Sequence, residues 1–190
     1  MPRRRYIFDP PERFVAGTVG EPGDRTFFLQ ARDGGRVVSV VLEKVQVAVL
    51  ADRLNRLLDE LDQRGVTAAV APVASVTPDA EPLDEPVVEA FRAGTLTLGW
   101  DGTSDRVLVE ARAQTEDDDE ATEADDVLPD DDAEDGPDVF RVLLTAPAAR
   151  AFVDRAVQVI AAGRPPCPLC GQPLDPLGHI CPRRNGHYVN

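Results

Sequence analysis

Histidine and cysteine are missing from most of this chain. All three cysteines and both histidines lie in the last 24 of its 190 residues, so the 166 residues before Cys167 contain no thiol and no imidazole. These two groups are the usual nucleophiles and general bases near neutral pH. Their absence removes cysteine–histidine and serine–histidine catalysis from the body of the protein, and we assign no catalytic residue.

Long hydrophobic runs are missing as well. No stretch approaches the roughly 20 apolar residues of a membrane span. The basic residues 3–5 are followed by only three apolar residues before Asp9, which is too short for the apolar region of a signal peptide. We therefore expect a cytoplasmic protein without membrane contact.

Residues 116–138 lack basic and aromatic side chains and hold 14 of the 34 acidic residues. The other 20 acidic residues are balanced by 20 basic ones, so this segment accounts for the whole net charge of −14. Such a run cannot bury enough apolar surface to offset the entropy of ordering it. We predict a disordered insert. A docking surface for a basic partner is the alternative, and calcium binding is disfavoured because the spacing is not that of an EF-hand.

The remaining sequence contains an apparent duplication. FVAGTV at 14–19 reappears as FRAGTL at 91–96, and a later match between 41–53 and 143–155 has a larger offset. The difference between the offsets is close to the length of the acidic insert. We therefore predict two related units, 1–70 and 89–163, joined by a proline-rich linker at 71–88.

Each unit is expected to contain three strands followed by a helix. Runs of β-branched and aromatic residues separated by glycine-containing turns predict strands at 14–19, 26–31, 36–42, 91–98, 106–112 and 139–144. Leucines at helical spacing predict a helix over 50–61 that ends near Gly65. Thr145 is the expected N-cap of the second helix. The predicted fold class is α+β: an antiparallel sheet with two helices, related by a pseudo-two-fold axis, and a small tail at 164–190.

That tail has the spacing of a metal site. It reads Cys167-x2-Cys170-x8-His179-x-Cys181-x5-His187, and two thiolates separated by two residues readily bind one tetrahedral zinc ion. We predict a structural zinc held by Cys167, Cys170, His179 and Cys181, with His187 as the alternative fourth ligand. A catalytic zinc is disfavoured because Asp175, the one acidic residue in the group, is more typical of a turn than of a base.

The chain also resembles an actinobacterial family known only as a domain of unknown function. The resemblance rests on residues 6–18, 25–32 and 163–170, and on the ending Pro-Leu-Asp-Pro-x-Gly-His-x-Cys-Pro-Arg-x-Asn-Gly at 173–186. In that family an aromatic residue often stands at the position of His187, which favours His179 as the ligand. The resemblance also implies a shared process with a phosphoglycerate-mutase-like phosphatase and a phosphoinositide-kinase-like protein, but it assigns no activity.

These observations favour a zinc-bearing, non-enzymatic adaptor or regulatory protein with a protein partner. Nucleic-acid binding is the first alternative, and it is disfavoured because the tail carries only Arg164, Arg183 and Arg184 against Asp175. The second alternative is an enzyme acting on a phosphorylated metabolite through Asp9, Arg13 and Arg32. Arginines at these positions are better explained as exposed residues at the rim of a hairpin, so the enzyme is disfavoured.

Overall fold

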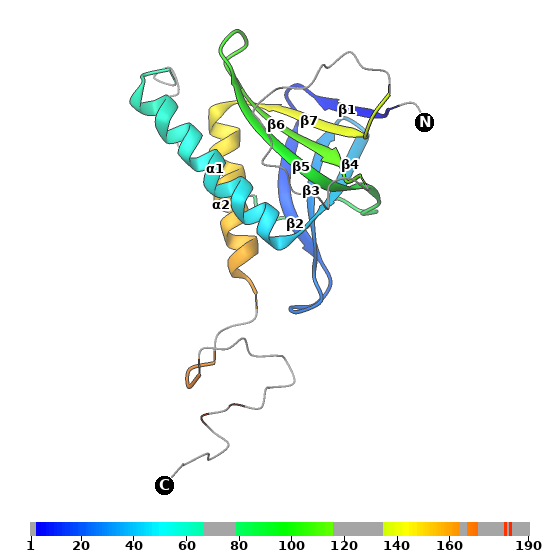
Figure 1. The fold of residues 1–190 in the computed structure, drawn as a ribbon, viewed down its shortest axis with the longest axis vertical. Helices are drawn as coiled ribbons and strands as arrows, with labels where there is room; N and C mark the ends of the chain where they lie inside the picture. Colours follow the sequence, from blue (N-terminus) through cyan, green and yellow to red (C-terminus); the bar gives the residue numbers. More distant parts are fainter. Residues whose placement is uncertain are drawn as a thin grey trace.

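The described part of the chain forms one sheet and two long helices. The computed structural model describes residues 3–66, 79–115, 135–163, 167–170, 181 and 183. In chain order its elements are β1 (Arg5–Phe8), β2 (Arg13–Val19), β3 (Thr26–Asp33), β4 (Arg36–Leu42), α1 (Lys44–Gln63), β5 (Glu89–Asp101), β6 (Arg106–Ala113), β7 (Val139–Leu144) and α2 (Ala146–Ala161). The predicted α+β class is confirmed, and the order strand, strand, strand, helix occurs twice after β1 (Figure 1).

The sheet is mixed, which corrects the prediction of an antiparallel sheet. Its strand order is β1-β7-β6-β5-β4-β3-β2. Neighbours pair antiparallel within β2-β3-β4 and within β5-β6-β7, whereas β4 pairs parallel with β5 and β1 pairs parallel with β7. Sequential hairpins explain the antiparallel pairs. The parallel β4–β5 pair needs a long crossover, and α1 lies within the connection between these two strands.

The sheet must curl strongly, because β1 and β2 are consecutive in the chain but lie at opposite ends of the strand order. Six strand spacings would separate the two edges of a flat sheet by about 29 Å. The short connection from Phe8 to Arg13 spans at most about 18 Å. Aromatic contacts across the inside agree with this curvature: the ring centroid of Phe140 in β7 lies 5.9 Å from that of Phe8 and 6.3 Å from that of Phe14 in β2.

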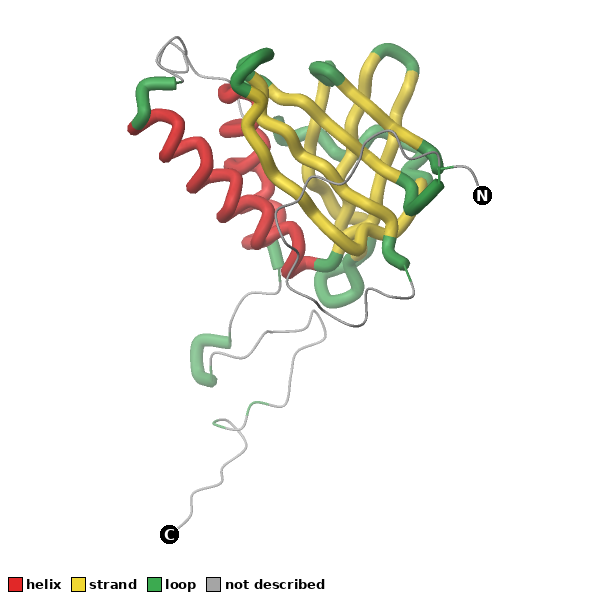
Figure 2. The backbone as a smooth tube through the Cα atoms, turned by 45° about the horizontal axis from the view of Figure 1, so that its top comes forward, coloured by secondary structure: helices red, strands yellow, loops and turns green. Residues whose placement is uncertain are grey.

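The two helices pack against one another on one side of the curled sheet (Figure 2). Their buried stripes join the inner faces of both halves in a single core. The ring of Phe152 in α2 stacks on Phe14 of β2 with centroids 4.6 Å apart. As predicted, Thr145 caps α2, since its side chain accepts a hydrogen bond from the backbone N–H of Ala148, and Gly65 has a positive φ just beyond α1.

Residues 79–88, here called the strap, cover the outer face of β2, β3 and β4. Leu83 of the strap is buried in a second cluster with Val15, Phe28 and Val41, which point away from the main core. At Gly17 an added Cβ would lie 2.5 Å from Leu83 Cδ2, so the strap approaches the strand directly. The linker predicted at 71–88 therefore includes a segment that packs on the sheet, while residues 67–78 lie outside the described part of the chain.

The origin of the two halves by duplication stays a prediction. So does the disorder of the insert at 116–138, because residues 116–134 lie outside the described ranges. None of the helices in the described part of the chain combines the length and the apolar character needed to cross a membrane.

Candidate metal centre

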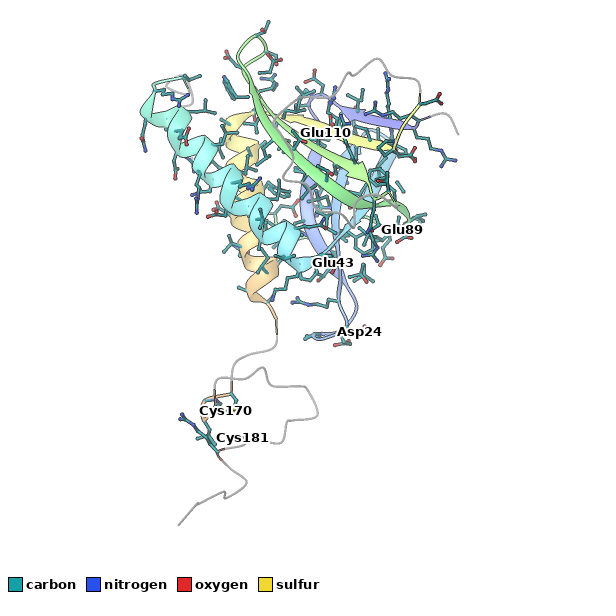
Figure 3. The ribbon with its side chains drawn as sticks, viewed as in Figure 1. Asp24, Glu43, Glu89, Glu110, Cys170 and Cys181 are labelled. Atoms are coloured by element: carbon teal, nitrogen blue, oxygen red, sulfur yellow. The ribbon has the colours of Figure 1, made fainter. Side chains whose placement is uncertain are left out.

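Three thiols meet in the C-terminal part of the chain. The Sγ atoms of Cys167, Cys170 and Cys181, here called the cysteine cluster, all lie within 4.8 Å of one another. Cys167 Sγ is 3.9 Å from Cys181 Sγ. Two thiolates bound to one tetrahedral zinc, with Zn–S bonds of about 2.3 Å, are about 3.8 Å apart. The cluster thus has the spacing of three corners of a zinc site, and Figure 3 shows Cys170 and Cys181 beyond the end of α2, apart from the sheet.

The backbone around Cys167 favours its thiolate form. Residues 167–170 form a turn, and the N–H of Leu169 donates to Cys167 Sγ over 3.5 Å. The backbone N–H of Cys170, and then that of Leu169, hold the pKa of the Cys167 thiol below its usual value. A thiol binds a metal ion only after it is deprotonated, so this turn prepares a ligand.

The three thiols differ in exposure. Cys167 and Cys181 are each only 5% exposed, whereas Cys170 is half-buried. The predicted ligands Cys167, Cys170 and Cys181 are therefore brought together, with Cys170 on the accessible side. His179, its alternative His187, and Asp175 lie outside the described residues, so the fourth ligand stays a prediction.

A second polar site, unrelated to the cysteines, is buried under the strap. Arg13 of β2 is only 9% exposed. Its guanidinium donates to both carboxylate oxygens of Asp79 at 2.6 and 3.0 Å and to Asp84 at 2.8 Å. It also donates to the backbone carbonyls of Glu81 and Pro82. Several groups of the strap thus bind one cation, the Arg13 guanidinium.

Arg155 of α2 holds the same segment from the other side. It donates to the carbonyl of Ala16 in the edge strand β2 at 2.8 Å, to the carboxylate of Asp79 at 2.8 Å, and to the carbonyl of Glu81 at 2.6 Å. Burial lowers the pKa of this arginine, whereas the hydrogen bonds from Arg13 hold the pKa of Asp79 below its usual value. One carboxylate thus joins a strand, a helix and the strap.

Two neighbouring contacts complete what we call the arginine network. Arg32 of β3 donates to Asp84 at 2.8 Å. The buried amide of Gln30 exchanges hydrogen bonds with the backbone N–H and carbonyl of Asp84, at 2.7 and 3.0 Å. Two aspartates therefore meet three arginines here: Arg13, Arg32 and Arg155.

The arginine network corrects the expectation that Arg13 is exposed, and no sequence pattern predicted that Arg155 belongs to it. The description as an exposed hairpin residue is wrong for Arg13, although Arg32, with 37% of its side chain exposed, fits it. The enzyme alternative grouped Arg13 and Arg32 with Asp9, but the structure brings the two arginines to Asp84. The participation of Arg155 had no local signal, because its partners lie 74 to 139 residues away.

Another buried carboxylate lies in the second half of the sheet. Glu110 of β6 is 2% exposed and accepts hydrogen bonds from Arg112 at 2.8 Å and from Arg141 of β7 at 2.7 Å. Glu110 and Arg141 are directly opposed in the β6–β7 register. Such a pair favours this register, because a shift would separate the buried Glu110 carboxylate from one of its two arginines.

The mixed sheet, its two helices and the cysteine cluster define an α+β protein with a candidate metal centre. The chain belongs to the family described as "Protein of unknown function (DUF3090)", whose model matches residues 6–181. That match includes Cys167, Cys170, His179 and Cys181 and ends before His187. Comparisons with curated proteins and with solved structures give no match.

Proposed function

We propose that this protein is a zinc-bearing, non-enzymatic adaptor or regulatory protein. The observation that carries the proposal is the convergence of three thiols within 4.8 Å of one another. Sulfur-rich sites select zinc and other thiophilic ions over magnesium and calcium. A site closed by four protein ligands stabilises a fold and leaves no position for a reacting water.

The proposed fourth ligand is His179. It is two residues from Cys181, close enough for both side chains to reach one ion, and it lies within the residues that the family model matches. His187, six residues beyond Cys181, is the alternative. Zinc bound in this way would order a segment that has too few apolar residues to form a core of its own.

Free thiols and a thiolate-bound metal require a reducing environment. This requirement supports a cytoplasmic location. In the adaptor role the proposed partners are proteins, with the kinase-like and phosphatase-like proteins of the family resemblance as the first candidates. A basic partner is proposed for the acidic insert at 116–138, because 14 like charges attract a surface of opposite sign.

The arginines that suggested an enzyme give it little support. Arg13 and Arg32 are both engaged by aspartates of the same chain. A phosphorylated substrate would have to displace these carboxylates. An adaptor role does not require these carboxylates to be displaced.

Metal analysis tests the centre. Full-length protein purified in reducing buffer without chelator is expected to contain one zinc per chain by mass spectrometry. Cys170→Ser and His179→Ala should lose the metal in competition with a chelator, whereas the matched variant His187→Ala should keep it. A metal-free wild type would overturn the zinc proposal. Loss of zinc from His187→Ala but not from His179→Ala would make His187 the fourth ligand in place of His179.

The adaptor role needs a separate test. The purified kinase-like and phosphatase-like candidates are tested for binding to three baits. These are the zinc-loaded protein, the chelator-treated protein and a variant lacking residues 116–138. Binding that depends on the metal or on the acidic insert supports the proposal. Binding by none of the three baits to either candidate counts against these partners.

A further inference from the structure

The cysteine cluster contains one thiol more than a disulfide uses. Cys167 and Cys181 are the two buried members, with sulfur atoms 3.9 Å apart. A disulfide has an S–S bond of about 2.05 Å, so a closure of about 2 Å would join them. Cys170 is the accessible member. The residues before Cys167 contain no other cysteine, so no other thiol in the chain competes for an oxidant.

We infer that the cysteine cluster is a peroxide-sensitive switch, in which Cys170 reacts first and a Cys167–Cys181 disulfide is the end state. This regulation rests on the proposed function in one respect only: the ion it releases is the proposed zinc. The disulfide and the metal exclude one another, because both use the same two sulfur atoms.

The chemistry proceeds in three steps. The Cys170 thiolate attacks one oxygen of a hydroperoxide, the O–O bond breaks, and Cys170 becomes a sulfenic acid while the departing hydroxide or alkoxide takes a proton from the solvent. Cys167 then attacks the sulfur of Cys170, and the sulfenic oxygen departs as water, leaving a Cys167–Cys170 disulfide. Finally Cys181 attacks Cys167 and expels the Cys170 thiolate. Two thiols lose two electrons, and the peroxide that accepts them is reduced.

The geometry favours this order. Thiol oxidation follows exposure as well as thiolate character, and Cys170 is the least buried of the three thiols. The last exchange transfers the bond to the two buried sulfurs, which lie 3.9 Å apart. It closes a loop between residues 14 apart in sequence, so the tail would remain joined at the same two positions after the ion has left.

Peptide mapping after oxidation identifies the disulfide. Reduced, zinc-loaded, full-length protein is treated with one equivalent of hydrogen peroxide, and free thiols are blocked with N-ethylmaleimide. Cleavage before Asp175 puts Cys167 and Cys170 on one peptide and Cys181 on another. We expect the two peptides to be linked through Cys167, with the maleimide on Cys170 and one zinc released to a chromogenic chelator. A dominant Cys167–Cys170 disulfide at the end point would overturn the proposal.

Two variants separate the steps. Cys170→Ser, compared with metal-free wild type, should oxidise roughly tenfold or more slowly and still give the Cys167–Cys181 bond. Cys181→Ser should stop at Cys167–Cys170. Oxidation of Cys170→Ser at the metal-free wild-type rate would overturn the role of Cys170.

The outcome also separates this proposal from the zinc proposal, because metal content is measured before peroxide is added. A metal-free protein that forms Cys167–Cys181 would support the switch and overturn the zinc. A zinc-loaded protein that keeps its metal after one equivalent of peroxide, with all three thiols still blocked by maleimide, would overturn the switch and leave the zinc intact.

Discussion

The strap and the cysteine cluster are both held by a few polar groups. The two regions differ in the source of the positive charge that these groups bind. The carboxylates and carbonyls of residues 79–84 bind the buried guanidinium groups of Arg13 and Arg155. The sulfurs of Cys167, Cys170 and Cys181 converge on one another, and as thiolates they repel each other unless a cation lies between them. The strap is thus held by groups of the chain itself, whereas the three sulfurs are a candidate site for an added ion. Under the proposed function the tail responds to metal supply and to thiol oxidation, and the body does not.

The largest effect is expected from removing the metal, and it should be confined to the tail. A chelator should take the zinc content from one per chain to zero and abolish the protection of amide hydrogens at residues 167–170. Protection in β3 and α1 should not change, because the strap and core are held without the ion. Hydrogen exchange followed by mass spectrometry measures both regions in one experiment. A loss of protection across the whole chain would contradict the separation of the two regions.

Arg13→Ala should produce the next effect, this time in the body. Removing one partner from a buried ionic group is strongly destabilising, and in this variant Asp79 and Asp84 would keep only their contacts with Arg155 and Arg32. Because Asp79 and Asp84 keep 33% and 24% of their side-chain exposure, we expect the free energy of unfolding to fall by about 3 kcal/mol, toward the lower end of the range for buried pairs. Urea denaturation measures this change, and the zinc content should stay at one per chain.

Arg92→Ala is the matched control for this prediction. The Arg92–Glu43 ion pair has a 2.8 Å contact like that between Arg13 and Asp84, but both of its side chains are at least half exposed. Its removal should cost less than about 1 kcal/mol. Equal effects of the two substitutions would show that burial of the arginine network adds nothing to the free energy of unfolding.

The same contrast explains what the sequence could predict. Local patterns predicted the hairpin strands, α1 from its leucine spacing, and the Thr145 cap, because these depend on neighbouring residues. The spacing of Cys167, Cys170 and Cys181 predicted the cysteine cluster for the same reason. The short strand β1 and its parallel pairing with β7 depend on residues 134 positions away and left no local signal. The burial of Arg13 depends on Asp79, 66 positions away, so composition alone favoured an exposed arginine.

Gly17→Ala tests how closely the strap approaches β2. The new Cβ would lie 2.5 and 2.6 Å from Leu83 Cδ2 and Cγ, so Leu83 would have to move. Overpacking of this kind costs about 1–3 kcal/mol. Gly99→Ala is the matched control in β5, where the nearest side-chain atom is an ordinary 3.8 Å away. Adding Leu83→Ala should remove most of the penalty of Gly17→Ala. A double-mutant cycle with no coupling would contradict the contact.

The smallest expected effect is the acid sensitivity of the strap. Hydrogen bonds from Arg13 lower the pKa of Asp79 in the folded protein below the ordinary 3.8. A depressed carboxyl pKa stabilises the fold above the unfolded-state pKa, and this stabilisation is lost as the pH falls through the folded-state pKa. We therefore expect the free energy of unfolding to decrease between about pH 5 and pH 2 by about 1 kcal/mol or less from Asp79, since its side chain is a third exposed.

Asp79→Asn should remove this part of the pH dependence, and Arg13→Ala should remove the larger share of it, because Arg155 still contacts Asp79 in that variant. Urea titrations of wild type and of Cys170→Ser at a series of pH values measure it. The two proteins should lose the same amount of body stability as the pH falls, since the arginine network contains no cysteine. A difference between them in the Asp79-dependent part would mean that the tail contributes to holding the strap, and the two regions would then no longer be independent.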